Sequence, residues 1–132
     1  MEQQSLQESS FCLQETAPNA LSLLPRNLRH KKAVEDLREV YFANKQLLAL
    51  PDMRQFESLE VLWLNNNRLR LVTGLDDNFR ITDLHLQNNR ITTLEGSIEL
   101  LANLEVLNLA NNRLENLART LECLSDCRRL KV

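Results

Sequence analysis

The chain has 132 residues, which corresponds to one small domain or to a piece of a larger one. Leucine and asparagine are abundant, with 29 and 14 copies, whereas glycine and histidine each occur only twice. Gly74 and Gly96 are too far apart for a phosphate-binding glycine loop, and two histidines with three cysteines are poor material for a metal site. The net charge of −2 gives no overall attraction to nucleic acid. The composition therefore argues against an enzyme and predicts no cofactor and no metal.

The N-terminal part of the chain carries no repeated pattern. Residues 1–20 are rich in glutamine, serine and glutamate, and we expect a disordered tail there. Residues 21–36 are expected to form an N-terminal capping segment, with a helix from Ser22 to Asp36. Its apolar residues are spaced as on one helix face, and His30 would lie on the solvated side.

Several features favour the cytoplasm and no contact with a membrane. No apolar run approaches the ~18 residues of a membrane span, and the polar N-terminus lacks the hydrophobic core of a signal peptide. Three cysteines leave one unpaired in any disulfide scheme, which suits a reducing compartment. Cys123 and Cys127 have the spacing of half a metal site, but without further ligands we expect them to be small core residues.

From residue 37 onward, four segments repeat one pattern of aliphatic residues. They begin at Leu37, Leu59, Ile81 and Leu104, with spacings of 22, 22 and 23 residues. Each follows the pattern L-x-x-L-x-L-x-x-N-x-L, which is typical of leucine-rich repeats. The sequence therefore predicts an α/β fold, a leucine-rich repeat solenoid with a curved parallel sheet on its concave side and short helical or 3-10 segments on its convex side. The expected repeats are 37–58, 59–80, 81–103 and 104–126, with the start of a fifth at 127–132.

The positions within a repeat predict which side chains are buried. Aliphatic residues at positions 1, 4 and 6 should face the core, as should those at position 11, namely Leu69, Ile91 and Leu114. A convex layer should follow, formed by Leu75, Phe79, Ile98, Leu101, Leu121 and Leu124. Stacked asparagines at position 9 should satisfy buried backbone groups. This asparagine ladder comprises Asn67, Asn89 and Asn112; the first repeat has Lys45 there, and Asn44 is expected to compensate.

The side chains between the buried positions predict a binding surface on the concave face. Position 5 holds Tyr41, Trp63, His85 and Asn108, so the single tyrosine and single tryptophan share one exposed column. Aromatic side chains at the centre of a polar face are typical of interface hot spots. The predicted partner-binding residues are Tyr41, Trp63, His85, Asn108, Glu39, Asp83, Asn65 and Gln87. The alternative is that the rings only stack across strands and stabilise the sheet.

A second column at position 10 is basic. Arg68, Arg90 and Arg113 form this arginine rim, which is able to clamp acidic side chains, phosphate or RNA. The alternative is a solvated edge that keeps the protein soluble.

Three segments resemble a known subclass of repeats. WLNNNRL (63–69), TDLHLQNNRITTLEG (82–96) and LENLARTLECL (114–124), with the pair Gly74-Leu75, resemble sds22-type leucine-rich repeats, in particular those of short proteins from ciliated cells. The resemblance implies a non-catalytic scaffold or adaptor that binds a protein partner, in a cilium or axoneme. It also implies the alternatives of a regulatory subunit of a phosphatase or of a ribonucleoprotein complex. We expect a monomer unless an open C-terminal end pairs.

Overall fold

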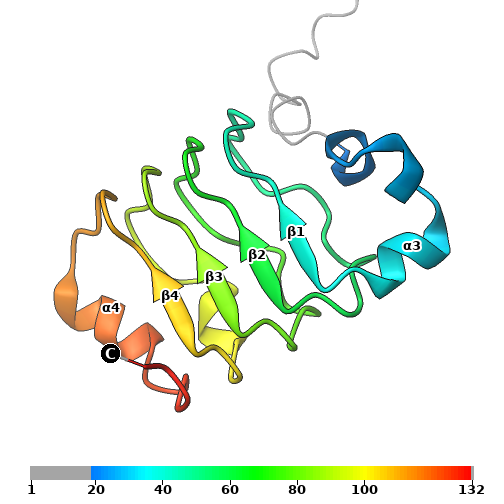
Figure 1. The fold of residues 1–132 in the computed structure, drawn as a ribbon. Helices are drawn as coiled ribbons and strands as arrows, with labels where there is room; N and C mark the ends of the chain where they lie inside the picture. Colours follow the sequence, from blue (N-terminus) through cyan, green and yellow to red (C-terminus); the bar gives the residue numbers. More distant parts are fainter. Residues whose placement is uncertain (1–18, 132) are drawn as a thin grey trace, which may run out of the picture.

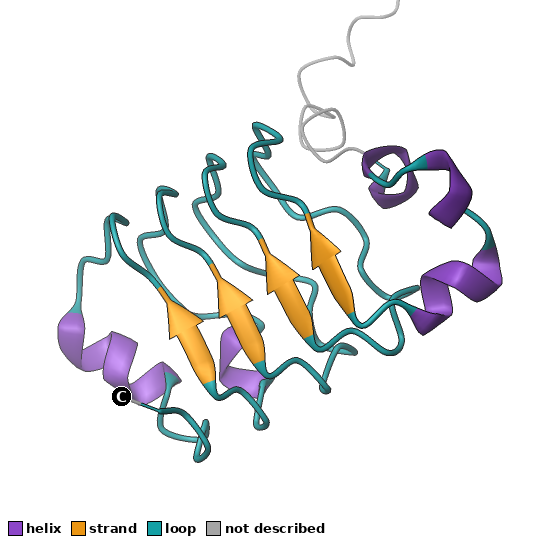
Figure 2. Cartoon of the chain, viewed as in Figure 1, coloured by secondary structure: helices purple, strands orange, loops and turns teal. Residues whose placement is uncertain are grey.

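The computed structural model describes residues 19–131. Four short strands form one parallel sheet in the order β1-β2-β3-β4. They are β1 (Glu39–Tyr41), β2 (Val61–Trp63), β3 (Asp83–His85) and β4 (Val106–Asn108). Each strand belongs to one turn of a solenoid, and long loops return the chain behind the sheet to the next strand (Figures 1 and 2). The predicted α/β leucine-rich repeat architecture is confirmed.

The register of the sheet follows the repeat. Val40, Leu62, Leu84 and Leu107, all at position 4, lie opposite one another in consecutive strands. Three of them are fully buried and Leu107 is partly buried, because alternate residues of a strand point to opposite faces of the sheet. Equal repeat lengths thus place equal positions side by side.

The core contains most of the expected leucines, with one exception at position 11. Leu69 and Ile91 are fully buried, whereas Leu114 is 36% exposed. Within the described residues, the turn that holds Leu114 is stacked against a neighbour on one side only. Its inner side chains therefore lack half of the cover that the earlier turns have.

The convex layer differs from the prediction at two positions. Leu75, Ile98 and Leu101 are buried, and Leu124 is partly buried, but Phe79 and Leu121 are each 59% exposed. Asn78, the residue before Phe79, is buried instead. Its side-chain amide donates to the carbonyls of Met53 and Phe56.

Leu121 is exposed because it lies on the outer side of a helix. This helix, α4 (Leu117–Cys123), buries Thr120 and Cys123 against the rest of the molecule. The two side chains between them in sequence, Leu121 and Glu122, therefore point outward. A 3-10 segment, η3 (Ile98–Leu100), occupies the corresponding place in the preceding turn.

The cap is not the continuous helix from Ser22 to Asp36 that the sequence suggested. It consists of η1 (Ala20–Leu23), η2 (Arg26–Leu28) and α3 (Lys31–Asp36). Pro25 lies between the first two, where it fixes φ and offers no backbone N–H to a longer helix.

Another break lies at His30, which is the N-cap of α3 and whose Nδ1 accepts a hydrogen bond from the Ala33 N–H. This histidine is therefore more than a solvated surface residue. Ala20, Leu24 and Val34 join the core. The cap thus covers the first turn with short segments rather than with one long helix.

The fifth repeat begins at Leu130 rather than at Cys127. The Lys131 N–H donates to the Glu105 carbonyl at 2.8 Å, as the Glu105 N–H donates to the Thr82 carbonyl one turn earlier at 2.7 Å. Glu105 holds position 2 of its repeat, so Lys131 holds position 2 as well, and not position 5.

Cys127 corresponds instead to Leu101 of the preceding turn. The Leu130 N–H donates to the Cys127 carbonyl just as the Leu104 N–H donates to the Leu101 carbonyl, both at 3.1 Å. The fourth repeat therefore spans residues 104–129, because α4 uses more residues than η3. The expected boundary at 126 was wrong for this reason.

No helix within residues 19–131 combines the length and apolar character needed to cross a membrane.

Candidate functional site

The concave face is held in place by asparagines at position 9. The Asn67 Oδ1 accepts the N–H groups of Lys45 and Leu47 at 3.0 Å each, and its Nδ2 donates to the Phe42 and Leu64 carbonyls at 2.9 Å. Asn89 and Asn112, the next two asparagines of the ladder, each repeat three of these bonds, namely the one accepted from the position-11 N–H and the two donated to position-6 carbonyls. Each amide serves backbone groups that no helix or sheet reaches.

Lys45 takes part in the asparagine ladder through its backbone, because its N–H donates to Asn67 Oδ1. The expected compensation by the side chain of Asn44 is not seen. Among the described residues that side chain makes no hydrogen bond, and Asn44 contributes a left-handed backbone instead, with φ of 59°.

The asparagines at position 8 form a second row, whose backbone conformation was not predicted from the sequence. Asn44, Asn66, Asn88 and Asn111 all have φ between 57° and 61°. Asparagine tolerates this left-handed region better than most residues. Its recurrence at position 8, one place before the ladder, was therefore the signal that could have predicted this backbone conformation. The Asn88 Nδ2 also donates to Asn66 Oδ1 at 2.7 Å, and the Asn111 Nδ2 to Asn88 Oδ1 at 2.8 Å. These side chains are thus bonded to one another along the surface.

The aromatic column on the concave face comprises Tyr41, Trp63 and His85, from β1, β2 and β3. The Trp63 and His85 rings are stacked with centroids 3.8 Å apart and planes at 8°. Tyr41 lies 5.9 Å from Trp63 with the rings tilted at 48°, and its side chain is 58% exposed. Pairing in register of position 5 in the three strands brings these rings together.

Two carboxylates flank the column at position 3. Glu39 is exposed, and its Oε2 accepts a hydrogen bond of 2.5 Å from Trp63 Nε1. Asp83, two strands away, accepts a bond from the Thr82 hydroxyl at 2.8 Å. Neither carboxylate forms an ion pair with any residue in the described range. The remaining predicted residues, Asn65, Gln87 and Asn108, are half-buried on the same face.

The arginine rim is in register one position beyond the ladder. The backbone N–H groups of Arg68, Arg90 and Arg113 donate to Leu47, Leu69 and Ile91 of the preceding turn at 2.8–2.9 Å. Their guanidinium groups form no ion pair within residues 19–131, whereas Arg54 and Arg119 do. The rim is thus a row of uncompensated positive charges beside the concave face.

Comparison with known families agrees with this geometry. Residues 79–132 match the family model described as Leucine rich repeat. The fold is a leucine-rich repeat solenoid. The match supports the leucine-rich repeat family, whose domains generally mediate protein–protein interaction and are typically non-catalytic. No curated protein matches the chain.

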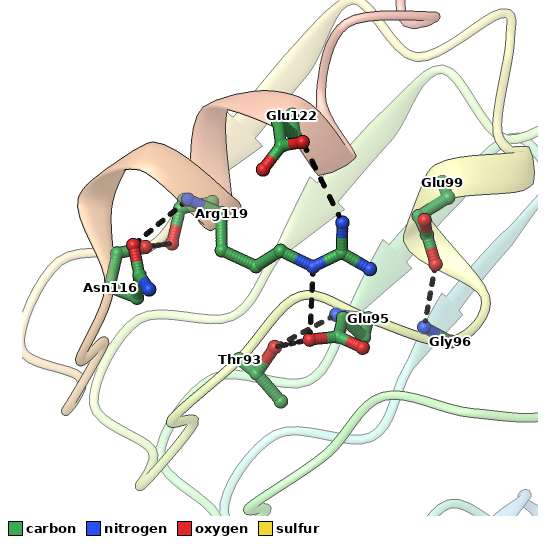
Figure 3. A network of polar contacts seen from close by, with 8 residues as sticks. Thr93, Glu95, Gly96, Glu99, Asn116, Arg119 and Glu122 are labelled. Atoms are coloured by element: carbon green, nitrogen blue, oxygen red, sulfur yellow. Dashed lines mark hydrogen bonds and ion pairs between the residues drawn. The ribbon is translucent and has the colours of Figure 1, made fainter.

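A polar network ties α4 to the preceding turn of the solenoid (Figure 3). The Arg119 Nε donates to Glu95 Oε2 at 3.2 Å, and the Arg119 N–H is capped by Asn116 Oδ1 at 3.0 Å. Hydrogen bonding to Arg119 lowers the pKa of Glu95, and the same bond raises the pKa of Arg119. These groups are exposed, so the network orients the helix and adds little stability.

The two cysteines of the solenoid lie in its core. Cys123 and Cys127 are buried free thiols, and burial raises the pKa of both. Within residues 19–131 no three histidine, cysteine, aspartate or glutamate side chains are grouped so that they could hold a metal ion.

Proposed function

We propose that this solenoid is a non-catalytic interaction module that binds a protein partner on its concave face, centred on the aromatic column. The supporting observation is that the chain's single tryptophan and single tyrosine both lie on the open face of the sheet, not in the core. Large rings that are already held rigidly lose little conformational entropy on binding, so they are effective contacts in an interface.

The flanking carboxylates give this surface a preferred partner chemistry. Glu39 and Asp83 lie beside the rings without a counter-ion among the described residues, so a lysine or arginine of the partner would find both a carboxylate and an aromatic ring. The hydrogen bond from Trp63 to Glu39 fixes one of these carboxylates before binding.

The test replaces Trp63 by alanine in the full chain. We expect the Trp63→Ala variant to retain its circular dichroism and to bind the partner more weakly by ~2 kcal/mol or more, since central aromatic residues dominate interface energies. The measurement is quantitative affinity purification from ciliated cells, followed by titration of the purified partner. Phe79→Ala is the control, because it also removes an aromatic ring, from an exposed residue outside the sheet.

Undiminished binding by Trp63→Ala would reject the concave face as the site. If the alanine variant instead unfolds at a lower temperature while it binds as before, the rings serve only to stabilise the sheet.

A second candidate function uses the arginine rim to bind an acidic or phosphate-bearing partner, such as RNA or a protein of a ribonucleoprotein or phosphatase complex. The unpaired guanidinium groups favour it. In the same titration, binding through the rim would weaken steeply with salt and on Arg90→Glu, whereas binding through the aromatic column would be less sensitive to both. Recovery of axonemal proteins would support a ciliary role.

A further inference from the structure

The exposed edge of β1 differs from the same edge of every other strand. In the interior of the sheet, the carbonyls at positions 5 and 7 accept backbone N–H groups from the preceding turn. Phe42 donates to Trp63 at 2.8 Å and Asn44 donates to Asn65 at 3.2 Å, and the next two turns repeat both bonds. The position-3 N–H is bonded in the same direction, as Val61 donates to the Arg38 carbonyl at 2.9 Å.

The corresponding groups of β1 have no such partner among the described residues. They are the Glu39 N–H, the Tyr41 carbonyl and the Ala43 carbonyl. Because Phe42 pairs toward β2, its neighbour Tyr41 directs its backbone groups away from β2. The cap lies on that side of β1 in Figure 1, yet no hydrogen bond joins η1, η2 or α3 to this edge. The cap thus protects the core without completing the sheet.

A cleft of about 480 Å³ lies between the cap and this strand. The cap contributes Leu23, Leu24 and Leu28 to it, and the first turn contributes Val40, Tyr41 and Lys45. The walls are therefore largely aliphatic. The lining holds two charged side chains, Glu39 at the start of β1 and Lys45 beyond its end, and Lys45 forms no ion pair within residues 19–131.

We propose that this cleft receives an extended segment of a partner protein, which adds to β1 as a further parallel strand. A strand edge with unpaired backbone groups is a template for such addition. In the solenoid's own turns, positions 4 and 6 carry apolar side chains that face the core. An added segment places equivalent residues against the leucines of the cap, and an acidic group at its C-terminal end lies next to Lys45. The cleft borders the proposed concave-face surface and shares Tyr41 and Glu39 with it, but the contact proposed here is made through the backbone of β1 and not through the aromatic rings.

The probe is a synthetic peptide that copies residues 103–111, Asn-Leu-Glu-Val-Leu-Asn-Leu-Ala-Asn, with a free C-terminal carboxylate. In the proposed register, the amide copied from Leu109 donates to the Tyr41 carbonyl, and the amide copied from Asn108 faces away from β1. We expect N-methylation of the former to weaken binding by about tenfold or more, since it removes a bond and leaves a carbonyl unpaired. N-methylation of the latter should leave binding unchanged.

The location is tested on the full-length protein by NMR. We expect saturable peptide-induced shifts at the Glu39 and Tyr41 amides and slower hydrogen exchange of both. Leu28→Glu should abolish these changes, whereas Leu100→Glu, an exposed leucine outside the cleft, should preserve them. The two N-methylated peptides alter no protein residue, so the test does not depend on how the variants fold.

Three outcomes overturn the proposal. They are an absence of saturable binding, equal binding of the two N-methylated peptides, and shifts confined to β4. Trp63→Ala leaves the Tyr41 backbone in place, so a failure of the concave-face proposal does not affect this result.

Discussion

Asparagines at the adjacent positions 8 and 9 stabilise this solenoid in different ways. Asn88 supplies a left-handed backbone and a side-chain bond on the surface, whereas Asn89 is buried and bonds three backbone groups of two turns. The difference is one of burial, because an unsatisfied polar group is costly only where water cannot reach it.

Replacing Asn89 by leucine should therefore be strongly destabilising. The Leu69 N–H and the Leu64 and Leu86 carbonyls would lose a buried partner, and we expect a loss of about 3 kcal/mol in the free energy of unfolding, measured by urea denaturation. Asn103→Leu is the control, since its amide makes one exposed bond to the Phe79 carbonyl and should cost under about 1 kcal/mol. Similar losses for both variants would contradict this account of the ladder.

The two glycines offer a second comparison at the scale of single residues. Both have positive φ, but an added Cβ at Gly74 meets open space, whereas one at Gly96 would lie 3.1 Å from both Thr73 Cγ2 and the Val72 carbonyl. Alanine should cost about 1–2 kcal/mol at Gly74 from backbone strain alone. We expect a larger loss for Gly96→Ala, measured by the same urea denaturation. Equal losses would show that the loop moves to accept the methyl group.

Among the elements, the strands were the most predictable and the helices the least. The strands follow from position, because a fixed repeat aligns Val61, Asp83 and Val106 in one row whatever their side chains. The helical segments depend on prolines, helix caps and helix lengths, which the repeat pattern does not describe. Pro25 and the His30 cap divide the N-terminal segment, and the length of α4 moves the fifth repeat to Leu130.

The candidate site shows the same division. The aromatic column was predictable, because position 5 fixes which side chains share a row. The stacking of Trp63 on His85 and the hydrogen bond to Glu39 depend on side-chain rotamers, for which a repeat pattern carries no signal. The cleft beside β1 could not be predicted either, since it arises from how η1 and η2 lie against the first turn.

The buried thiols of α4 and of the turn that follows it should react slowly in the native protein. Cys123 and Cys127 are buried and burial raises the pKa of both, so the reactive thiolate is scarce and shielded. In a Cys12→Ser variant, which leaves only these two thiols, we expect modification by a disulfide reagent to be at least about tenfold slower in the native protein than in urea. Rapid native modification would mean that α4 detaches readily.

On the scale of the whole molecule, each turn contacts only its neighbours, so stability is cooperative between turns and weakest at the ends. The two outermost turns each carry an open surface of their own. Leu117 and Leu121 are exposed beside β4, and the cleft lies beside β1. The broad concave face lies between them, and the sheet therefore offers chemically different surfaces along its length.

The asparagine row at position 8 gives the solenoid a direction. Asn111 donates to Asn88 and Asn88 donates to Asn66, so both side-chain bonds of the row run in the same direction along the solenoid. Aligned amides polarise one another, and reversing one would break the bonds on both of its sides. A turn stacked after Asn111 in the same sense would extend the row by donating an N–H group to Asn111 Oδ1. The row therefore favours further turns in the orientation that continues it.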